Sequence, residues 1–142
     1  MTQEHKELLL KDLCARLPYG VIVVTPKGRG YVCDINLTIF DYELGVNINP
    51  IIRDTFSIND VKPYLFPLSS MTKEQLFEVQ EILGKNEIEI GDGFLHIIDS
   101  DRNTITYLEI LALLEWFYKN HFDIYELIPM GLAIDATELN IY

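Results

Sequence analysis

The sequence predicts an α+β fold in which a small antiparallel sheet packs with about three α-helices. Strand-like segments follow one another through short turns, which favours antiparallel hairpins over parallel strands joined by helical crossovers. Three longer segments instead repeat apolar residues every three or four positions, which is the spacing of one helix face. The pairing stays open between two hairpins and a meander plus a hairpin.

The first helix is predicted over residues 2–17, and Pro18 ends it because proline cannot continue a helix. Its apolar residues recur at i, i+3, i+4 and i+7 and are expected to form one buried stripe: Leu10, Leu13, Cys14 and Leu17.

Two extended segments follow this helix. The β-branched run 21–25 predicts a strand covered on both faces, and residues 26–30 with their two glycines predict a turn. Residues 31–40 alternate with period two, which indicates a half-buried strand with Cys33 on its inward face. Whether 31–43 is one strand or two stays open, because Asp34-Ile35-Asn36 can also form a turn. Residues 46–68 contain three prolines and no steady period, so irregular or extended structure over the core is expected.

The second helix has a well-marked start. Thr72 and Gln75 have the spacing of a capping box, and Met71 and Leu76 that of a hydrophobic staple. The helix is expected to end at Gly84.

A hairpin and a third helix complete the prediction. Asp92-Gly93 joins segments 87–91 and 94–98, which places Glu89 opposite His96. Residues 104–120 form a helix that is apolar on more than one side. We expect this helix at the centre of the domain, with Leu111 and Leu114 in the core and the remaining apolar side covered by the same chain.

Length and charge bound the function. The 142 residues predict one domain, with the order of 135–142 left open and a flexible tail as one alternative. The net charge is −11, and residues 71–142 hold 4 Lys/Arg against 14 Asp/Glu. So acidic a half repels phosphate backbones, which disfavours direct nucleic-acid binding. The charge is expected to form a solvated surface that keeps the protein soluble, with an acidic face for a basic protein partner as the alternative. The sequence has two cysteines, no signal-like segment and no membrane-spanning run, which predicts a cytoplasmic protein.

Candidate catalytic residues are few. His96, Asp99 and Asp101 carry ligand and acid–base groups, but their spacing matches no known metal motif, and capping and pairing roles explain them better. Buried thiols are poor nucleophiles, so neither Cys14 nor Cys33 is expected to react. No cofactor or metal is predicted.

Two further features concern the last helix. His121 follows its end, where a cation complements the helix dipole. An aromatic cluster lies nearby and is assigned to core packing, with partner contact as the alternative: Trp116, Phe117, Tyr118, Phe122 and Tyr125.

Two segments carry a resemblance to a known family. Residues 61–75 read VKPYLFPLSSMTKEQ, and residues 120–134 read NHFDIYELIPMGLAI. They resemble the paired segments KPYLRPLSSMTEEE and HHFDYRGLIPMGLAL of a family of short proteins from gut-bacterial genomes and their prophages. Phe66 stands where that pattern has arginine, and the family brings no activity to carry over.

The expected function is therefore a non-enzymatic interaction or accessory protein of a bacterial mobile element or its host. The alternative is a small metal-dependent or hydrolytic enzyme that uses His96, Asp99 and Asp101. A minor alternative is an acidic mimic of nucleic acid that occupies a basic groove.

Overall fold

Three α-helices pack with a mostly antiparallel sheet in the computed structural model, which confirms the predicted α+β class. The structure describes residues 1–49, 51–84, 87–91, 94–99 and 106–142. The helices are α1 (Gln3–Arg16), α2 (Lys73–Ile82) and α3 (Tyr107–Lys119). None of the helices in the described ranges is long and apolar enough to cross a bilayer.

The main sheet begins as a four-stranded antiparallel meander and extends through a fifth strand. Its strands run in the spatial order β4-β3-β2-β1-β5-β8, and β9 also pairs with β5. Their bounds are β1 (Ile22–Thr25), β2 (Gly28–Leu37), β3 (Tyr42–Asn49), β4 (Ile52–Ser57), β5 (Lys62–Pro67), β8 (Phe122–Asp123) and β9 (Ile134–Asp135). The separate hairpin consists of β6 (Glu87–Gly91) and β7 (Phe94–Asp99). The meander-plus-hairpin alternative is therefore the one observed.

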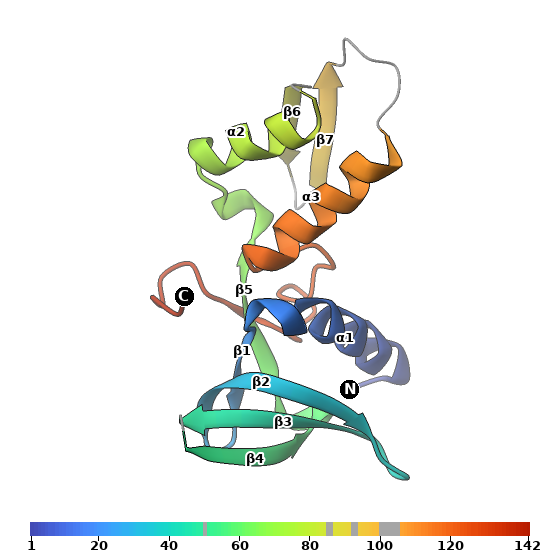
Figure 1. Ribbon diagram of the computed structural model, residues 1–142, viewed down its shortest axis with the longest axis vertical. Helices are drawn as coiled ribbons and strands as arrows, with labels where there is room; N and C mark the ends of the chain where they lie inside the picture. Colours follow the sequence, from blue (N-terminus) through green and yellow to red (C-terminus); the bar gives the residue numbers. More distant parts are fainter. Residues whose placement is uncertain (50, 85–86, 92–93, 100–105) are drawn as a thin grey trace.

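Figure 1 shows two parts along the long axis of the molecule. The meander lies at one end and α1 covers it. Helices α2 and α3 lie at the other end with the β6–β7 hairpin, and β5 runs from the first part towards the second. The largest core cluster joins α1 to the meander and to residues 127–133, while Phe117, Phe122, Val79 and Leu83 form smaller clusters around α2 and α3.

Of residues 46–68, the described ones (46–49 and 51–68) are mostly extended. They contain the end of β3, then β4 and β5, with a short 3₁₀ turn (Ile58–Asp60) between them. Proline is tolerated here because β5 pairs with β1 at only two positions, Val23 with Pro63 and Val24 with Lys62. Further 3₁₀ turns follow α1 (Leu17–Tyr19) and β5 (Leu68–Ser70).

Residues 31–43 belong to two strands, β2 and the start of β3, and the break between them does not fall at Asp34-Ile35-Asn36. Strand β2 continues through Asp34 and Asn36 to Leu37, and the chain then turns into β3, which starts at Tyr42. A bulge between Val32 and Asp34 shifts the register. Because a bulge adds one residue, the inward-outward alternation breaks there, and Cys33 is exposed instead of facing inward.

The start and end of α2 are as predicted. The Thr72 hydroxyl accepts from the backbone N–H of Gln75, and the Gln75 side chain accepts from the backbone N–H of Thr72, so the capping box is complete. Met71 and Leu76 both pack against the Val79–Leu83 cluster. Gly84 has φ of +69°, the left-handed value typical of a residue that ends a helix.

The C-terminal segment 135–142, for which the sequence left order open, contacts β1 and β5. Ala136 is buried, and its N–H donates to the Leu65 carbonyl at 2.8 Å. The Tyr142 hydroxyl donates to the Tyr64 carbonyl at 2.8 Å and accepts from the Ile22 N–H at 3.2 Å.

Candidate functional site

The predicted metal or acid–base site falls on β7 and the segment after it. In the β6–β7 ladder His96 lies opposite Glu89, as the hairpin predicts, and Asp99 lies opposite Glu87. For His96 and Asp99 the structure describes the strand, and Asp101 lies outside the described residues. The enzyme alternative that uses these three residues therefore stays a prediction. Within the described ranges, no group of three or more His, Cys, Asp or Glu is placed to hold a metal ion.

The expected turn at residues 26–30 is the β1–β2 hairpin. The Thr25 hydroxyl donates to the Gly28 carbonyl at 2.7 Å, and Lys27 forms an ion pair with Asp54. Gly28 has φ of +126°, which only glycine adopts readily. This basic stretch therefore turns the chain, and its lysine already has a carboxylate partner.

Both cysteines are exposed, so the prediction that they are buried was wrong. Helix α1 buries Leu9, Asp12, Leu13 and Arg16, and this turns Cys14 out of the stripe. The Cys14 thiol is nevertheless partly buried, and this burial raises its pKa.

The most concentrated polar chemistry in the described ranges is a buried cluster around Arg16. Its guanidinium and the Asp12 carboxylate are both fully buried and one helical turn apart. Arg16 Nε donates to Asp12 Oδ2 at 2.7 Å, and Arg16 Nη2 donates to Asp12 Oδ1 at 2.8 Å. The same Nη2 donates to the Phe122 carbonyl at 2.6 Å, which connects α1 to the chain after α3. We call Asp12, Arg16, Tyr118, His121 and Asp123 the Arg16 cluster.

His121 is neutral in this cluster, so its predicted role as a cation at the helix end was wrong. The side chain is only 8% exposed and stacks on Tyr142, with ring centroids 3.6 Å apart. Burial, with a smaller contribution from the charge of Arg16, lowers the pKa of His121 to about 4. The residue also has φ of +60°, so the backbone turns left-handed directly after the helix.

Burial controls the other ionisable groups of the cluster as well. It raises the pKa of Asp12, while the hydrogen bonds and charge of Arg16 act in the opposite direction. Burial also raises the pKa of Tyr118, whose hydroxyl lies 3.2 Å from that of Tyr125. The Arg16 guanidinium lies over the Tyr118 ring, 5.3 Å from its centroid.

Asp123 organises the loop that follows the cluster. Its Oδ1 accepts from the Leu127 N–H at 2.9 Å, and its Oδ2 accepts from the Ile128 N–H at 2.8 Å. Its acceptor capacity is thus used on backbone donors, as in a capped turn.

The two segments that carry the family resemblance lie side by side. Strand β5, from the first segment, pairs in parallel with β8 and β9, from the second. Phe66 lies opposite Phe122 and contacts its ring, with centroids 6.2 Å apart. Phe66 is therefore partly buried against neighbouring aromatic rings at the position where the resemblance has arginine.

The Arg16 cluster has little capacity for catalysis. Both Asp12 oxygens are bound by Arg16, and Asp123 is bound by backbone donors, so neither carboxylate is free to act as a base. Arg16 Nη1 and His121 Nδ1 are buried without a hydrogen-bond partner in the described ranges. The cluster connects α1, α3 and β8, and both of its carboxylates are bound within the fold.

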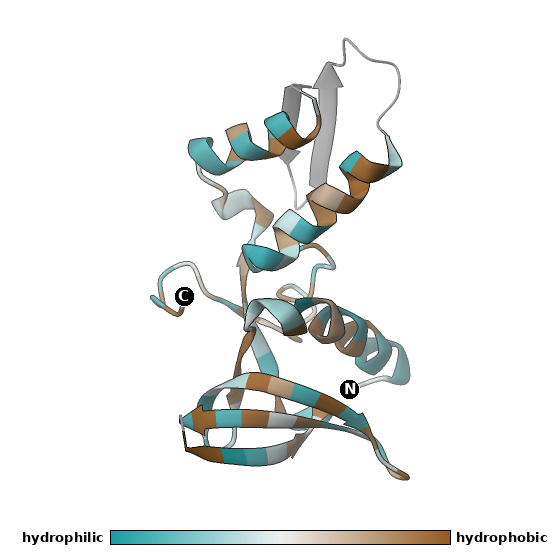
Figure 2. Ribbon diagram, viewed as in Figure 1, coloured by the Kyte–Doolittle hydropathy of each residue, from teal (hydrophilic) through white to brown (hydrophobic). Residues whose placement is uncertain are grey.

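The exposed surface of α3 is a stronger functional candidate. Five apolar residues of this helix are exposed by 37–77% and form what we call the α3 apolar face: Tyr107, Leu108, Ile110, Leu111 and Leu114. The prediction that Leu111 and Leu114 lie in the core was therefore wrong. The opposite side of the helix packs inward instead, through Leu113, Trp116 and Phe117. In Figure 2 the hydrophobic colour covers most of the half of α3 that lies away from α1, interrupted by hydrophilic bands.

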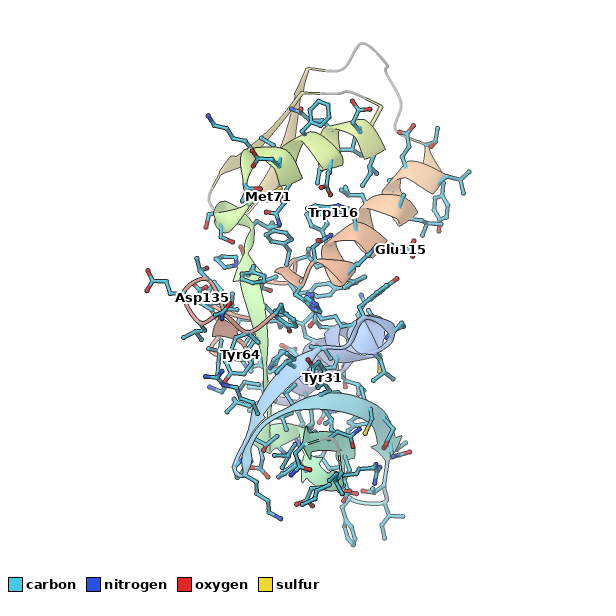
Figure 3. All side chains as sticks on the ribbon, turned by 60° about the vertical axis from the view of Figure 1, so that its left-hand side comes forward. Tyr31, Tyr64, Met71, Glu115, Trp116 and Asp135 are labelled. Carbon is cyan, nitrogen blue, oxygen red and sulfur yellow. The ribbon has the colours of Figure 1, made fainter. Side chains whose placement is uncertain are left out.

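The packed side of α3 confirms the core assignment for part of the aromatic cluster. Trp116 stacks on Phe122 with ring planes 11° apart, and its indole N–H donates to Glu78 of α2 at 2.8 Å. Figure 3 shows Trp116 between α3 and the start of α2 near Met71. One side of α3 is therefore fixed by α2 and β8, and the other faces water.

The sequence held partial signals for these features. Asp12 and Arg16 have the i, i+4 spacing of a helical ion pair, and α3 is too apolar for one buried face.

No protein-family model, curated protein or solved structure matches this chain.

Proposed function

We propose that this chain is a non-enzymatic interaction protein that binds a basic protein partner through the α3 apolar face. The observation that carries the proposal is the exposure of Leu108 and Leu111, at 77% and 48%, on a helix whose other side is already packed. Contiguous exposed apolar residues are typical of protein interaction sites.

Charge around this face favours a basic partner. Glu115 lies beside the face and is exposed. The exposed Glu74, Glu78 and Glu81 belong to α2, which packs on the other side of α3 and adds negative charge to the same end of the molecule. Lys119 is the only cation on α3. Complementary charge accelerates encounter and selects among partners, while the buried apolar area supplies most of the affinity.

The family resemblance and the free thiols support the remaining parts of the proposal. The resemblance is to proteins of gut bacteria and their prophages, so the proposed partner belongs to a mobile element or its host. Cys14 and Cys33 are exposed and unpaired, which is typical of proteins from a reducing cytoplasm.

The test compares two variants that make the same kind of change at opposite ends of the molecule. Leu111→Asp places a charge in the α3 apolar face, and Phe40→Asp does the same at the β2–β3 turn, where Phe40 is 90% exposed. Tagged wild-type protein and both variants are used to capture proteins from extracts of the native host, and binding of the retained protein is then measured with purified components.

The expected result is a basic protein that binds wild type and Phe40→Asp equally, binds Leu111→Asp at least tenfold more weakly, and dissociates faster as salt rises. Equal binding by all three proteins would refute the α3 face as the site. Sedimentation of the purified proteins tests whether the face binds a second copy of the chain instead. Wild-type dimers that Leu111→Asp abolishes would show this and would refute the proposed partner.

A further inference from the structure

A groove on the outer side of the meander forms a second, separate feature. It has a volume of about 430 Å³ and lies between β1, β2, β3 and the C-terminal segment. Its lining includes the aliphatic Ile22 and Ile141, the ring of Tyr31, and the polar side chains of Arg29, Asn47 and Asn49. Small-molecule sites have this size and this combination of apolar walls with a few polar groups.

The fold builds this groove from specific contacts. A Cβ atom at Gly30 would lie 2.5 Å from the Asn47 carbonyl oxygen, so only glycine lets β2 and β3 approach this closely. The register of β3 against β4 shifts between Asn47 and Asn49, which bends β3 along one wall. The opposite wall contains Ile141, which is held in place because the neighbouring Tyr142 hydroxyl bonds to both β1 and β5.

Arg29 is the charged residue of the groove, and it differs from the other described arginines. Arg16 is bonded to Asp12, and Arg53 makes three hydrogen bonds to Asp34. In the described ranges Arg29 has no carboxylate partner, and its guanidinium lies 5.5 Å from the centroid of the Tyr64 ring. A guanidinium over a ring keeps its N–H donors free to bind in the plane.

The neighbouring carboxamides add further donors. The Asn49 Oδ1 already accepts from the N–H groups of Ile51 and Ile52, each at 3.0 Å, which leaves its NH₂ group available. Asn47 lies beside Tyr31 across the ladder. The groove thus offers one positive charge and several N–H donors next to an aromatic ring and aliphatic walls.

We propose that this groove binds a planar aromatic carboxylate. Arg29 would bind the carboxylate, because a guanidinium matches the two carboxylate oxygens in a bidentate geometry. The ring of the ligand would pack between Tyr31 and the isoleucine side chains, and the Asn49 NH₂ group would donate to its polar edge. The site lies on the meander, away from α3, so it is independent of the proposed partner surface.

The experiment uses two probes with the same ring system and nearly the same size, of which only one carries a negative charge. Naphthalene-2-carboxylate and naphthalene-2-carboxamide are titrated separately into ¹⁵N-labelled protein, and backbone amide shifts give both the affinity and the location of binding. Wild type is compared with Arg29→Gln and with Lys73→Gln, which removes one positive charge from exposed α2. The spectrum of each variant also shows whether it is folded.

The proposal expects the carboxylate to shift the amides of Tyr31 and Asn47 and to bind wild type and Lys73→Gln about tenfold more tightly than the carboxamide, a difference of about 1.4 kcal/mol. In Arg29→Gln this preference should disappear while weak carboxamide binding persists. Equal affinity for both probes in wild type would overturn the proposal. Shifts confined to α3, or no saturation at millimolar probe, would overturn it as well.

Discussion

Removing Arg16 should destabilise the protein more than removing any other single charge, because it leaves Asp12 buried without a counter-ion. In Arg16→Met the carboxylate loses both hydrogen bonds from the guanidinium, at 2.7 and 2.8 Å, and the Phe122 carbonyl loses its donor at 2.6 Å. Breaking a buried pair in this way costs about 3–5 kcal/mol of unfolding free energy.

A double variant separates the buried charge from the loss of packing. In Asp12→Leu/Arg16→Met neither charge of the buried pair remains, and the unpaired Phe122 carbonyl costs about 1–3 kcal/mol. The double variant should therefore be more stable than Arg16→Met, although it carries more substitutions.

The dependence on pH gives an independent check. Burial raises the pKa of Asp12, and the largest opposing effect comes from Arg16. Without Arg16 the folded-state pKa should rise further above the unfolded value, so the folded state favours the neutral carboxyl. Compared with the double variant, in which His121 acts in the same way, the stability of Arg16→Met should then fall as pH rises from about 4 towards 7. This contribution is absent from the double variant, which has no Asp12.

Urea denaturation followed by Trp116 fluorescence is a suitable assay, because Trp116 stacks on Phe122, the residue whose carbonyl Arg16 binds. A single variant as stable as wild type at neutral pH would refute the reasoning. So would a double variant less stable than the single one.

Three further predictions concern other parts of the chain. Because burial lowers the pKa of His121 to about 4, below its unfolded value, stability should be complete above pH 6.5 and should fall by up to about 3 kcal/mol as pH drops from 6.5 towards 4. His121→Asn, which tolerates the left-handed backbone, should flatten that part of a pH series of urea midpoints; an unchanged series would contradict the assignment. Thr72→Ala should lower the free energy of unfolding by roughly 0.5–2 kcal/mol in the same assay. Ser70→Ala removes a hydrogen bond to the Pro67 carbonyl and leaves the cap intact, so it tests whether the loss of stability is specific to the capping box. Both Cys14 and Cys33 should react with a thiol reagent in the folded protein, Cys14 more slowly because burial raises its pKa, and protection of both until unfolding would show that they are not exposed.

The features that sequence predicted well depend on neighbours close along the chain. The capping box of Thr72 and Gln75 spans four residues, and the pairing of Glu89 with His96 was predicted from the Asp92-Gly93 dipeptide between them. Such local geometry is nearly independent of the rest of the fold.

The features that sequence missed depend on distant contacts. Hydrophobic periodicity places the charged Asp12 and Arg16 on the solvent-exposed side of the first helix. Nothing nearby in the sequence indicates that the Phe122 carbonyl, far along the chain, accepts a hydrogen bond from Arg16. In the same way, Leu111 is apolar whether it faces the core or a partner, and the positions of α2 and β8 decide which side of α3 is covered. The groove around Arg29 needs three strands and the C-terminal segment together, so no single stretch predicts it.

The bond between Arg16 and Phe122 also has a consequence for the order of events during synthesis. The two residues are 106 positions apart, so at about 5–20 residues per second a ribosome makes the acceptor roughly 5–20 s after the donor. The strands of the meander are all complete well before that time. Until Phe122 emerges, burying the guanidinium would leave one of its final bonds unmade, so α1 should settle fully onto the nascent sheet only late in translation.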